Sequence, residues 1–171
     1  MTRKSSAGRP STSRRTPRTG DVARSWASSE AVRGRMQRQK TRDTLPEMAV
    51  RRLLHRAGLR YRVDVPPLPG LRRRADIVFG PARVAVFIDG CFWHGCPEHG
   101  ARTTRSNSDY WAAKVARNRA RDNSTDDELA AAGWRVIRAW EHEDARSVAV
   151  RIAEVVAARR PARCRRLGGT D

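Results

Sequence analysis

One segment, FIDGCFWHGCPEHG at residues 87–100, constrains the fold of this chain more than any other. Its fourteen residues include two cysteines, two histidines, two acids and an adjacent Phe-Trp pair. A buried strand has no place for so many polar side chains, because each would need a partner in the core. A plain surface loop has no use for two exposed aromatic rings. The segment is therefore a candidate metal site, a candidate active site, or both.

Cysteine and histidine recur in this segment at a spacing typical of metal ligands. Cys91, Cys96 and His99 follow the pattern C-x4-C-x2-H, and thiolate and imidazole are ligands that zinc prefers. A structural zinc needs four ligands, and we expect His142, which directly follows the predicted strand WRVIRAWE, to supply the fourth. The alternatives are two free thiols beside surface histidines, or His94 as a zinc ligand in place of His99.

Hydrophobic patterning predicts an α/β fold, a small mixed sheet flanked by helices in the order α-β-β-β-α-β-α. A capped helix is expected between Thr44 and Gly58, followed by the short strand YRVDV. The apolar stretches ADIVF and RVAVFID are separated by GPA and are expected to pair as a hairpin. A long helix should run from Asp109 to about Ala132, either continuous or broken near Asn123. The strand WRVIRAWE and a final helix complete the fold.

Charge divides the chain into segments and indicates its partner. The chain has 171 residues and a formal net charge of +18 at pH 7. Residues 1–25 are rich in Ser, Thr, Pro, Gly and Arg and predict a disordered basic arm, residues 26–160 predict one domain, and residues 161–171 a flexible tail. The charge favours a polyanion, nucleic acid first. An anionic membrane surface is the weaker alternative, because no basic amphipathic helix is evident. Three cysteines without a secretion signal favour a cytoplasmic protein.

Three acids occupy positions suited to Mg²⁺. Asp76 opens one strand of the predicted hairpin, Asp89 closes the other, and Glu47 lies on the first helix. A nuclease that uses Mg²⁺ needs oxygen ligands at one end of a sheet and a group that activates water. The alternative is that these acids have no catalytic role, because acids flank strands in most proteins. His94 strengthens the nuclease interpretation, since a metal clip would fix the backbone around it and leave its ring free to act as general base.

Phe92 and Trp93 are adjacent, in an expected tight loop between the metal ligands, and they have two interpretations. Both rings could pack into the core, or they could enter a DNA duplex as apolar wedges between base steps. Met36, on a basic segment nearer the N-terminus, could be a second wedge.

On the long helix, Lys114, Asn118 and Asp122 are spaced four residues apart and therefore share one face. Arg117, Arg119 and Arg121 surround them. The stripe is either solvated or faces the acids and holds metal-bound water.

The chain resembles the Vsr family, the very short patch repair DNA mismatch endonucleases. The resemblance runs from about Met36 to about Arg160 through the following motifs: RGRMQRQKTRDTLPE, LPGLRRRADIVF, VAVFIDGCFWHGCPEHG, DYWAAKVARNRARD and AAGWRVIRAWE. It implies a restriction-endonuclease-like fold of the PD-(D/E)xK type, a structural zinc, and Mg²⁺-dependent nicking by a monomer. The implied substrate is double-stranded DNA, cut 5′ to the thymine of a T·G mismatch formed by deamination of 5-methylcytosine.

The resemblance also implies roles for single residues. Asp76 would bind the metal, His94 would be the general base, and Glu47 would orient metal-bound water. Met36, Phe92 and Trp93 would intercalate beside the mismatch. Asn118 and Asp122 would support the residues that contact the metal and the attacking water.

This sequence departs from the family's best-known pattern at the metal sites. Asp89 stands where the family has histidine, and it either adds a metal ligand or forms a hydrogen bond. Ile88 stands where the family has threonine, and its main-chain carbonyl could still bind Mg²⁺. The zinc set has two imidazoles, from His99 and His142, where the family pattern has one. Two other functions stay open, a non-catalytic zinc-bearing DNA-binding module and a nuclease of different DNA specificity on the same fold.

Overall fold

The computed structural model describes residues 42–100 and 108–160 of the 171-residue chain. The expected basic arm at residues 1–25, the wedge residue Met36 and the expected tail at residues 161–171 lie outside the described residues.

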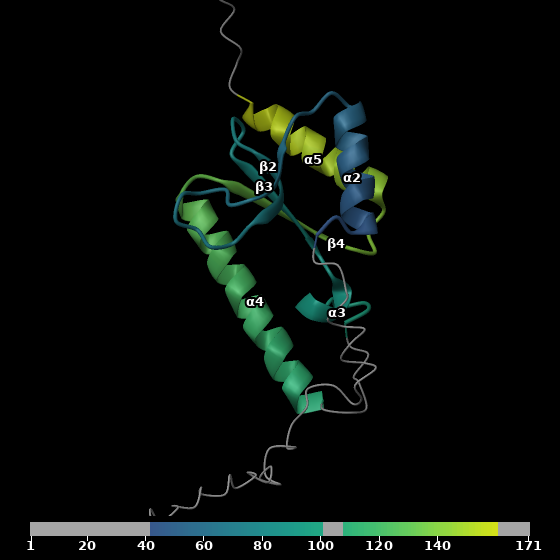
Figure 1. The fold of residues 1–171 in the computed structure, drawn as a ribbon, viewed down its shortest axis with the longest axis vertical. Helices are drawn as coiled ribbons and strands as arrows, with labels where there is room; N and C mark the ends of the chain where they lie inside the picture. The colour runs from purple at the N-terminus through teal and green to yellow at the C-terminus, as the bar shows by residue number, and fades with distance from the viewer. Residues whose placement is uncertain (1–41, 101–107, 161–171) are drawn as a thin grey trace, which may run out of the picture.

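A single four-stranded mixed sheet organises these residues, as the hydrophobic pattern predicts (Figure 1). Its strands are β1 (Arg62–Val65), β2 (Ala75–Phe79), β3 (Val84–Asp89) and β4 (Arg135–Trp140), and they lie side by side in that order. β1–β2 and β2–β3 are antiparallel, whereas β3 and β4 are parallel. The expected hairpin is therefore present, and the connection from β3 to β4 is a crossover through a long helix.

Helices cover both faces of the sheet. They are α2 (Leu45–Arg56), α3 (Cys91–His94), α4 (Ser108–Ala131) and α5 (Ala145–Arg159). In Figure 1, α2 and α5 lie together beside the strands, and α4 runs along the other side and extends toward α3. One apolar cluster includes Leu54 of α2 and Ile152 of α5, and the other includes Leu129 of α4. Both faces of β3 are covered, which explains its continuous apolar run.

The helix ends follow the sequence signals. At the start of α2, the Glu47 carboxylate accepts hydrogen bonds from the Thr44 hydroxyl (2.8 Å) and the Asp43 amide (2.9 Å). After α2 the chain reverses at Gly58, whose φ of 77° is accessible to glycine at little cost. Asp144 caps α5 by accepting from the Ser147 amide at 2.9 Å.

Two local expectations need correction. α4 is continuous through Asn123, so the alternative of a break there is wrong. Asn123 and Ser124 lie on the exposed side of α4, where their weak helix propensity is the only cost, while Thr125 and Leu129 are buried. The expected loop that carries Phe92 and Trp93 is instead the one-turn helix α3.

The sheet opens at one end. β2 and β3 pair from Phe79↔Val84 only as far as Ile77↔Val86, whereas β3 stays paired with β4 up to Asp89↔Trp140. At the opening, the Asp76 carboxylate accepts a hydrogen bond from the Ile88 amide at 2.7 Å. The side chain thus takes the place of a ladder partner and stands where the two strands part.

Within residues 42–100 and 108–160, no helix has the length and apolarity needed to cross a membrane.

Candidate active site and metal centre

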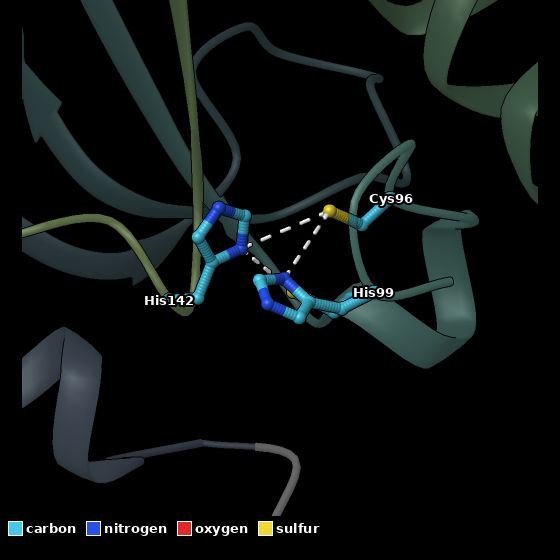
Figure 2. A group of neighbouring side chains, drawn as sticks. Cys96, His99 and His142 are labelled. Atoms are coloured by element: carbon cyan, nitrogen blue, oxygen red, sulfur yellow. Dashed lines mark hydrogen bonds between the residues drawn. The ribbon is translucent and has the colours of Figure 1, made fainter. Parts of the chain in front are cut away.

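Four side chains converge beside α3. The ligand atoms of Cys91, Cys96, His99 and His142 all lie within 4.8 Å of one another. Nδ1 of His142 is 3.0 Å from the Cys91 sulfur and 3.7 Å from the Cys96 sulfur, and Nδ1 of His99 is 3.9 Å from the Cys96 sulfur. Figure 2 shows Cys96, His99 and His142 pointing toward one another, His142 from the turn after β4. The structure therefore brings together the three residues that the spacing predicts and the fourth, His142, that its place after the last strand predicts.

The separations fit a tetrahedral metal. Zinc bonds of about 2.3 Å to sulfur and 2.0–2.1 Å to nitrogen place neighbouring ligands roughly 3.5 Å apart. On its other side, Nε2 of His142 is 3.3 Å from a Glu98 carboxylate oxygen. A carboxylate there favours the tautomer that carries its proton on Nε2. The unprotonated Nδ1, which lies near the sulfurs, is then available to a metal. His94 is not part of this group, because its Nδ1 faces Asp122 at 2.6 Å.

The cysteines of this group are buried and form no disulfide. Burial is the largest cause that raises the pKa of the Cys91 thiol to about 11, and the Cys96 thiol and the Glu141 carboxylate add to it. Glu141 also accepts a hydrogen bond from the Cys91 amide at 2.7 Å. Because a metal binds thiolate, its binding here has to displace protons.

Asp76 is the acid at the opening of the sheet. Burial raises the pKa of its carboxyl group to about 6, against the Ile88 amide hydrogen bond, which lowers it. The negative charges of Glu47, Asp89 and Asp64 raise this pKa further. A divalent cation would relieve this repulsion. In a strand the N–H and C=O of one residue point the same way, so the Ile88 carbonyl lies on the side of Asp76.

Glu47 reaches this site from the N-terminus of α2. It is buried, and both carboxylate oxygens accept hydrogen bonds, from the Thr44 hydroxyl and the Asp43 amide. It is therefore fixed by capping α2 while its charge acts on Asp76.

His94 ends α3 with a defined orientation. Its Nδ1 lies 2.6 Å from an Asp122 carboxylate oxygen. The side chain is 27% exposed. A carboxylate at Nδ1 leaves Nε2 as the basic nitrogen, the arrangement that a general base requires.

α4 holds α3 from behind. Asn118 donates to the Trp93 carbonyl at 2.7 Å, and Arg119 donates to the His94 carbonyl at 3.1 Å and to the Gly95 carbonyl. Arg121 donates to the other end of the Asn118 amide. Asn118 thus acts on the backbone that carries His94, and Asp122 acts on its ring.

The rings of α3 are half-buried against α4. Phe92 and Trp93 form edge contacts with the buried Trp111, with ring centroids 5.0 and 5.8 Å away. The Lys114 ammonium lies 5.1 Å from the Trp93 ring centroid, so Lys114 contacts the aromatic rings of this cluster. Neither ring is fully inside the core, and neither stands free of α4.

Asp89 closes β3 in an ion pair. Both of its carboxylate oxygens accept hydrogen bonds from one Arg138 nitrogen, at 2.8 and 3.0 Å, so of the two alternatives for this residue the geometry favours the hydrogen bond. Asp89 also lies 3.6 Å from Nδ1 of His94, and its charge raises the pKa of Asp76. Asp89 therefore places His94 and Asp76 at the same end of the sheet.

Comparison with known proteins identifies the protein family. Residues 28–99 match the family described as DNA mismatch endonuclease Vsr. The type II nicking enzyme V.NaeI of Lentzea aerocolonigenes is 43% identical over 123 residues, which cover 71% of this chain and 74% of that protein. The chain belongs to the Vsr family.

Other relatives agree with this assignment. The type II nicking enzyme V.XorIIP of Xanthomonas oryzae is 45% identical over 68% of this chain and 83% of that protein. The DNA mismatch endonuclease Vsr of Escherichia coli is 36% identical over 59% of this chain and 63% of that protein. This Vsr-family chain is a DNA endonuclease, a hydrolase of phosphodiester bonds, and the family implies a divalent metal.

Sequence reasoning missed two parts of the site, the carboxylate of Glu98 beside His142 and the guanidinium of Arg138. A signal for Arg138 was present. It stands at an inward position of the alternating strand RVIRAW, between Val136 and Trp140, where a charged side chain needs buried partners.

Proposed function

We propose that this endonuclease nicks double-stranded DNA on the 5′ side of the thymine in a T·G mismatch, and so starts very short patch repair of deaminated 5-methylcytosine. The observation that carries the proposal is the His94–Asp122 contact of 2.6 Å at the end of the sheet where Asp76 stands. A general base held in one tautomer beside a half-buried carboxylate suits hydrolysis of a phosphodiester. The family match supports the choice of DNA mismatches.

The acids at the sheet opening suit Mg²⁺. The residues that would hold it are Asp76, through its carboxylate, and Ile88, through its main-chain carbonyl, with Glu47 behind them. When bound, Mg²⁺ supplies charge stabilisation for the phosphate and the departing oxygen. Asp76 also sits in an arrangement of two antiparallel strands that suits the PD-(D/E)xK type of nuclease fold.

His94 is the residue that removes the proton of the attacking water. Its Nε2 accepts a proton from the attacking water while Asp122 stabilises the resulting imidazolium. Asn118 keeps the α3 backbone in place by its bond to the Trp93 carbonyl. We assign Asn118 and Asp122 to this supporting role.

Zinc is the metal we assign to Cys91, Cys96, His99 and His142. Two thiolates and two imidazoles are a common structural zinc set. The site would fix α3 to the end of β4 and leave His94 outside the coordination sphere.

Mismatch preference would come from Phe92 and Trp93, with Met36 as a second wedge. To enter the duplex, Phe92 and Trp93 have to exchange their contacts with Trp111 for contacts with bases. This exchange favours a base step that is already poorly stacked. This asymmetry is the physical source proposed for the T·G preference.

A related nuclease of different DNA specificity is the second candidate. The observation that favours it is the name of the relatives with the higher identity, which are called type II nicking enzymes. The zinc-bearing module without catalytic function is set aside by the family assignment.

A nicking assay across duplexes tests the proposal. End-labelled duplexes with T·G, with each other mismatch, and with full pairing are incubated with and without Mg²⁺. We expect nicking 5′ to the mismatched thymine only with Mg²⁺, and at least roughly a 100-fold loss for Asp76→Asn, because transition-state charge stabilisation depends on the metal. Asp127→Asn, at an exposed acid of α4, is the control. A preference for another duplex would favour the second candidate, and full activity of Asp76→Asn would contradict the mechanism.

A further inference from the structure

Arg138 joins three elements through its guanidinium. From β4 it donates to Asp89 on β3 at 2.8 and 3.0 Å. Toward α4 it donates from Nε to Asp126 at 2.9 Å and from Nη2 to Asp126 at 3.0 Å. The Phe87 ring lies beneath it, 4.7 Å from the guanidinium carbon. All three nitrogens are thus engaged, and the side chain is 24% exposed.

The same guanidinium also reaches the residue that orients His94. Nη2 of Arg138 lies 3.4 Å from the Asp122 carbonyl oxygen and 3.6 Å from Oδ1 of its carboxylate. The other carboxylate oxygen, Oδ2, holds Nδ1 of His94 at 2.6 Å. Asp122 therefore stands between an arginine and a histidine, with one oxygen toward each.

We propose that Arg138 is a positioning residue for hydrolysis: by fixing the Asp122 carboxylate from β4, it fixes the His94 ring with Nε2 toward the attacking water. The inference rests on the role proposed for His94. Among the described residues, the Asp122 carboxylate contacts His94 and Arg138. Loss of Arg138 would therefore leave it with the ring that it orients as its one partner in this part of the chain. Asp126, one turn further along α4, and Asp89 keep the guanidinium itself from turning.

The role requires a planar fork and not only a positive charge. A guanidinium can donate to several carboxylates at once in a fixed plane, whereas an ammonium is a compact charge on a flexible stem. Arg138→Lys therefore keeps the charge and loses the geometry. Arg138→Gln loses both.

The test measures steady-state nicking by the full chain, on whichever duplex the wild type nicks fastest. Roughly a 10- to 100-fold fall in kcat with little change in KM is expected for Arg138→Gln and for Arg138→Lys, because small displacements of a reacting group cost that much. Arg159→Gln is the matched control. Arg159 also bridges elements, by donating to the Ala82 and Gly133 carbonyls in turns outside the site, so its loss should lower the melting temperature and spare kcat.

A double variant separates positioning from general damage. If Arg138 acts through Asp122, then Arg138→Gln combined with Asp122→Asn should lose no more kcat than Asp122→Asn alone. Multiplied losses would overturn the inference.

An NMR measurement gives a readout independent of activity. The ¹⁵N and ¹H signals of the His94 ring should report an Nδ1–H in a strong hydrogen bond in the wild type and in Arg159→Gln, and a weakened bond in Arg138→Gln. An unchanged ring signal with unchanged kcat in both Arg138 variants would overturn the inference. A wild type that nicks a duplex other than T·G would refute the proposed substrate and leave this comparison intact.

Discussion

Asp76 carries a carboxyl group whose surroundings favour the protonated form. Its pKa is about 6, raised from an ordinary value of 3.8, mainly by burial, with Glu47, Asp89 and Asp64 adding negative charge. Between these two values the folded chain holds a proton that the unfolded chain releases. The free energy of unfolding therefore falls as the pH rises from about 4 to about 6, and the full cost is present above pH 6.

Asp76→Asn should remove this cost. The amide can still accept from the Ile88 amide, so in Mg²⁺-free buffer at pH 7.5 we expect the variant to be more stable by roughly 2–3 kcal/mol. Below about pH 4 the variant and wild type should be equally stable. Urea unfolding followed by Trp fluorescence at several pH values measures the difference. Added Mg²⁺ should stabilise only the wild type, and a variant less stable at every pH would contradict the electrostatic account.

Single residues differ in how far the sequence reveals them. Asp76 and His94 stand out because a carboxylate at a strand start and a histidine inside a metal loop have recognisable chemistry. Arg138 does not, since its partners Asp89, Asp122 and Asp126 come from two other elements and meet only in the folded chain. For the stripe of Lys114, Asn118 and Asp122 the sequence left two alternatives, a solvated face or one toward the acids. In the fold Lys114 contacts the rings of Trp93 and Tyr110, which a helical spacing alone does not reveal.

At the scale of elements, α3 is too short to be stable alone. A four-residue helix forms one turn, and helix nucleation is unfavourable in water. It is held by contacts with other elements, through His142 beside the Cys91 sulfur and through the donors Asn118 and Arg119 on α4. This is also why the sequence predicts a loop here, since its local propensity contains no helix signal. The longer helix α2 was predicted because its apolar residues recur on one face and its N-terminal end carries Thr44 and Pro46.

Gly95, directly after α3, tests how closely the segment approaches α4. Its φ is 65°, and a Cβ there would lie 2.6 Å from a methyl group of Val115. Gly58, with a φ of 77°, has no atom within 4 Å of such a Cβ. Gly58→Ala should cost about 1 kcal/mol of unfolding free energy, from the backbone alone, and Gly95→Ala roughly 2–4 kcal/mol from backbone and overpacking together. Equal losses in urea unfolding would show that α3 is not packed tightly on α4.

At the scale of the whole molecule, the four candidate metal ligands Cys91, Cys96, His99 and His142 join segments that are distant in sequence. Cys91 and His142 stand 51 positions apart, at the ends of the parallel strands β3 and β4. The spacing of the cysteines predicts the first three ligands, and the position of His142 after WRVIRAWE predicts the fourth. The strand order around them was harder to foresee, because a hairpin signal is local and the pairing of β4 with β3 is not.

Metal content tests this link. Elemental analysis should find about one zinc per chain, and Cys96→Ser should lower both the zinc content and the melting temperature, since metal binding contributes to folding free energy. Cys164→Ser is the control, because Cys164, outside the described residues, is not among the four expected ligands. Retention of zinc by Cys96→Ser, or loss of zinc by Cys164→Ser, would contradict the assigned ligand set.

The parting of β2 and β3 has a consequence for how this enzyme can vary. At Ile88 the side chain packs with the apolar cluster under α2 and α5, while the amide, and with it the carbonyl, is turned to Asp76. Whatever chemistry the carbonyl performs is common to every amino acid. Position 88 can therefore drift among residues that suit the interior, threonine or isoleucine alike, and the oxygen presented to the acids does not change.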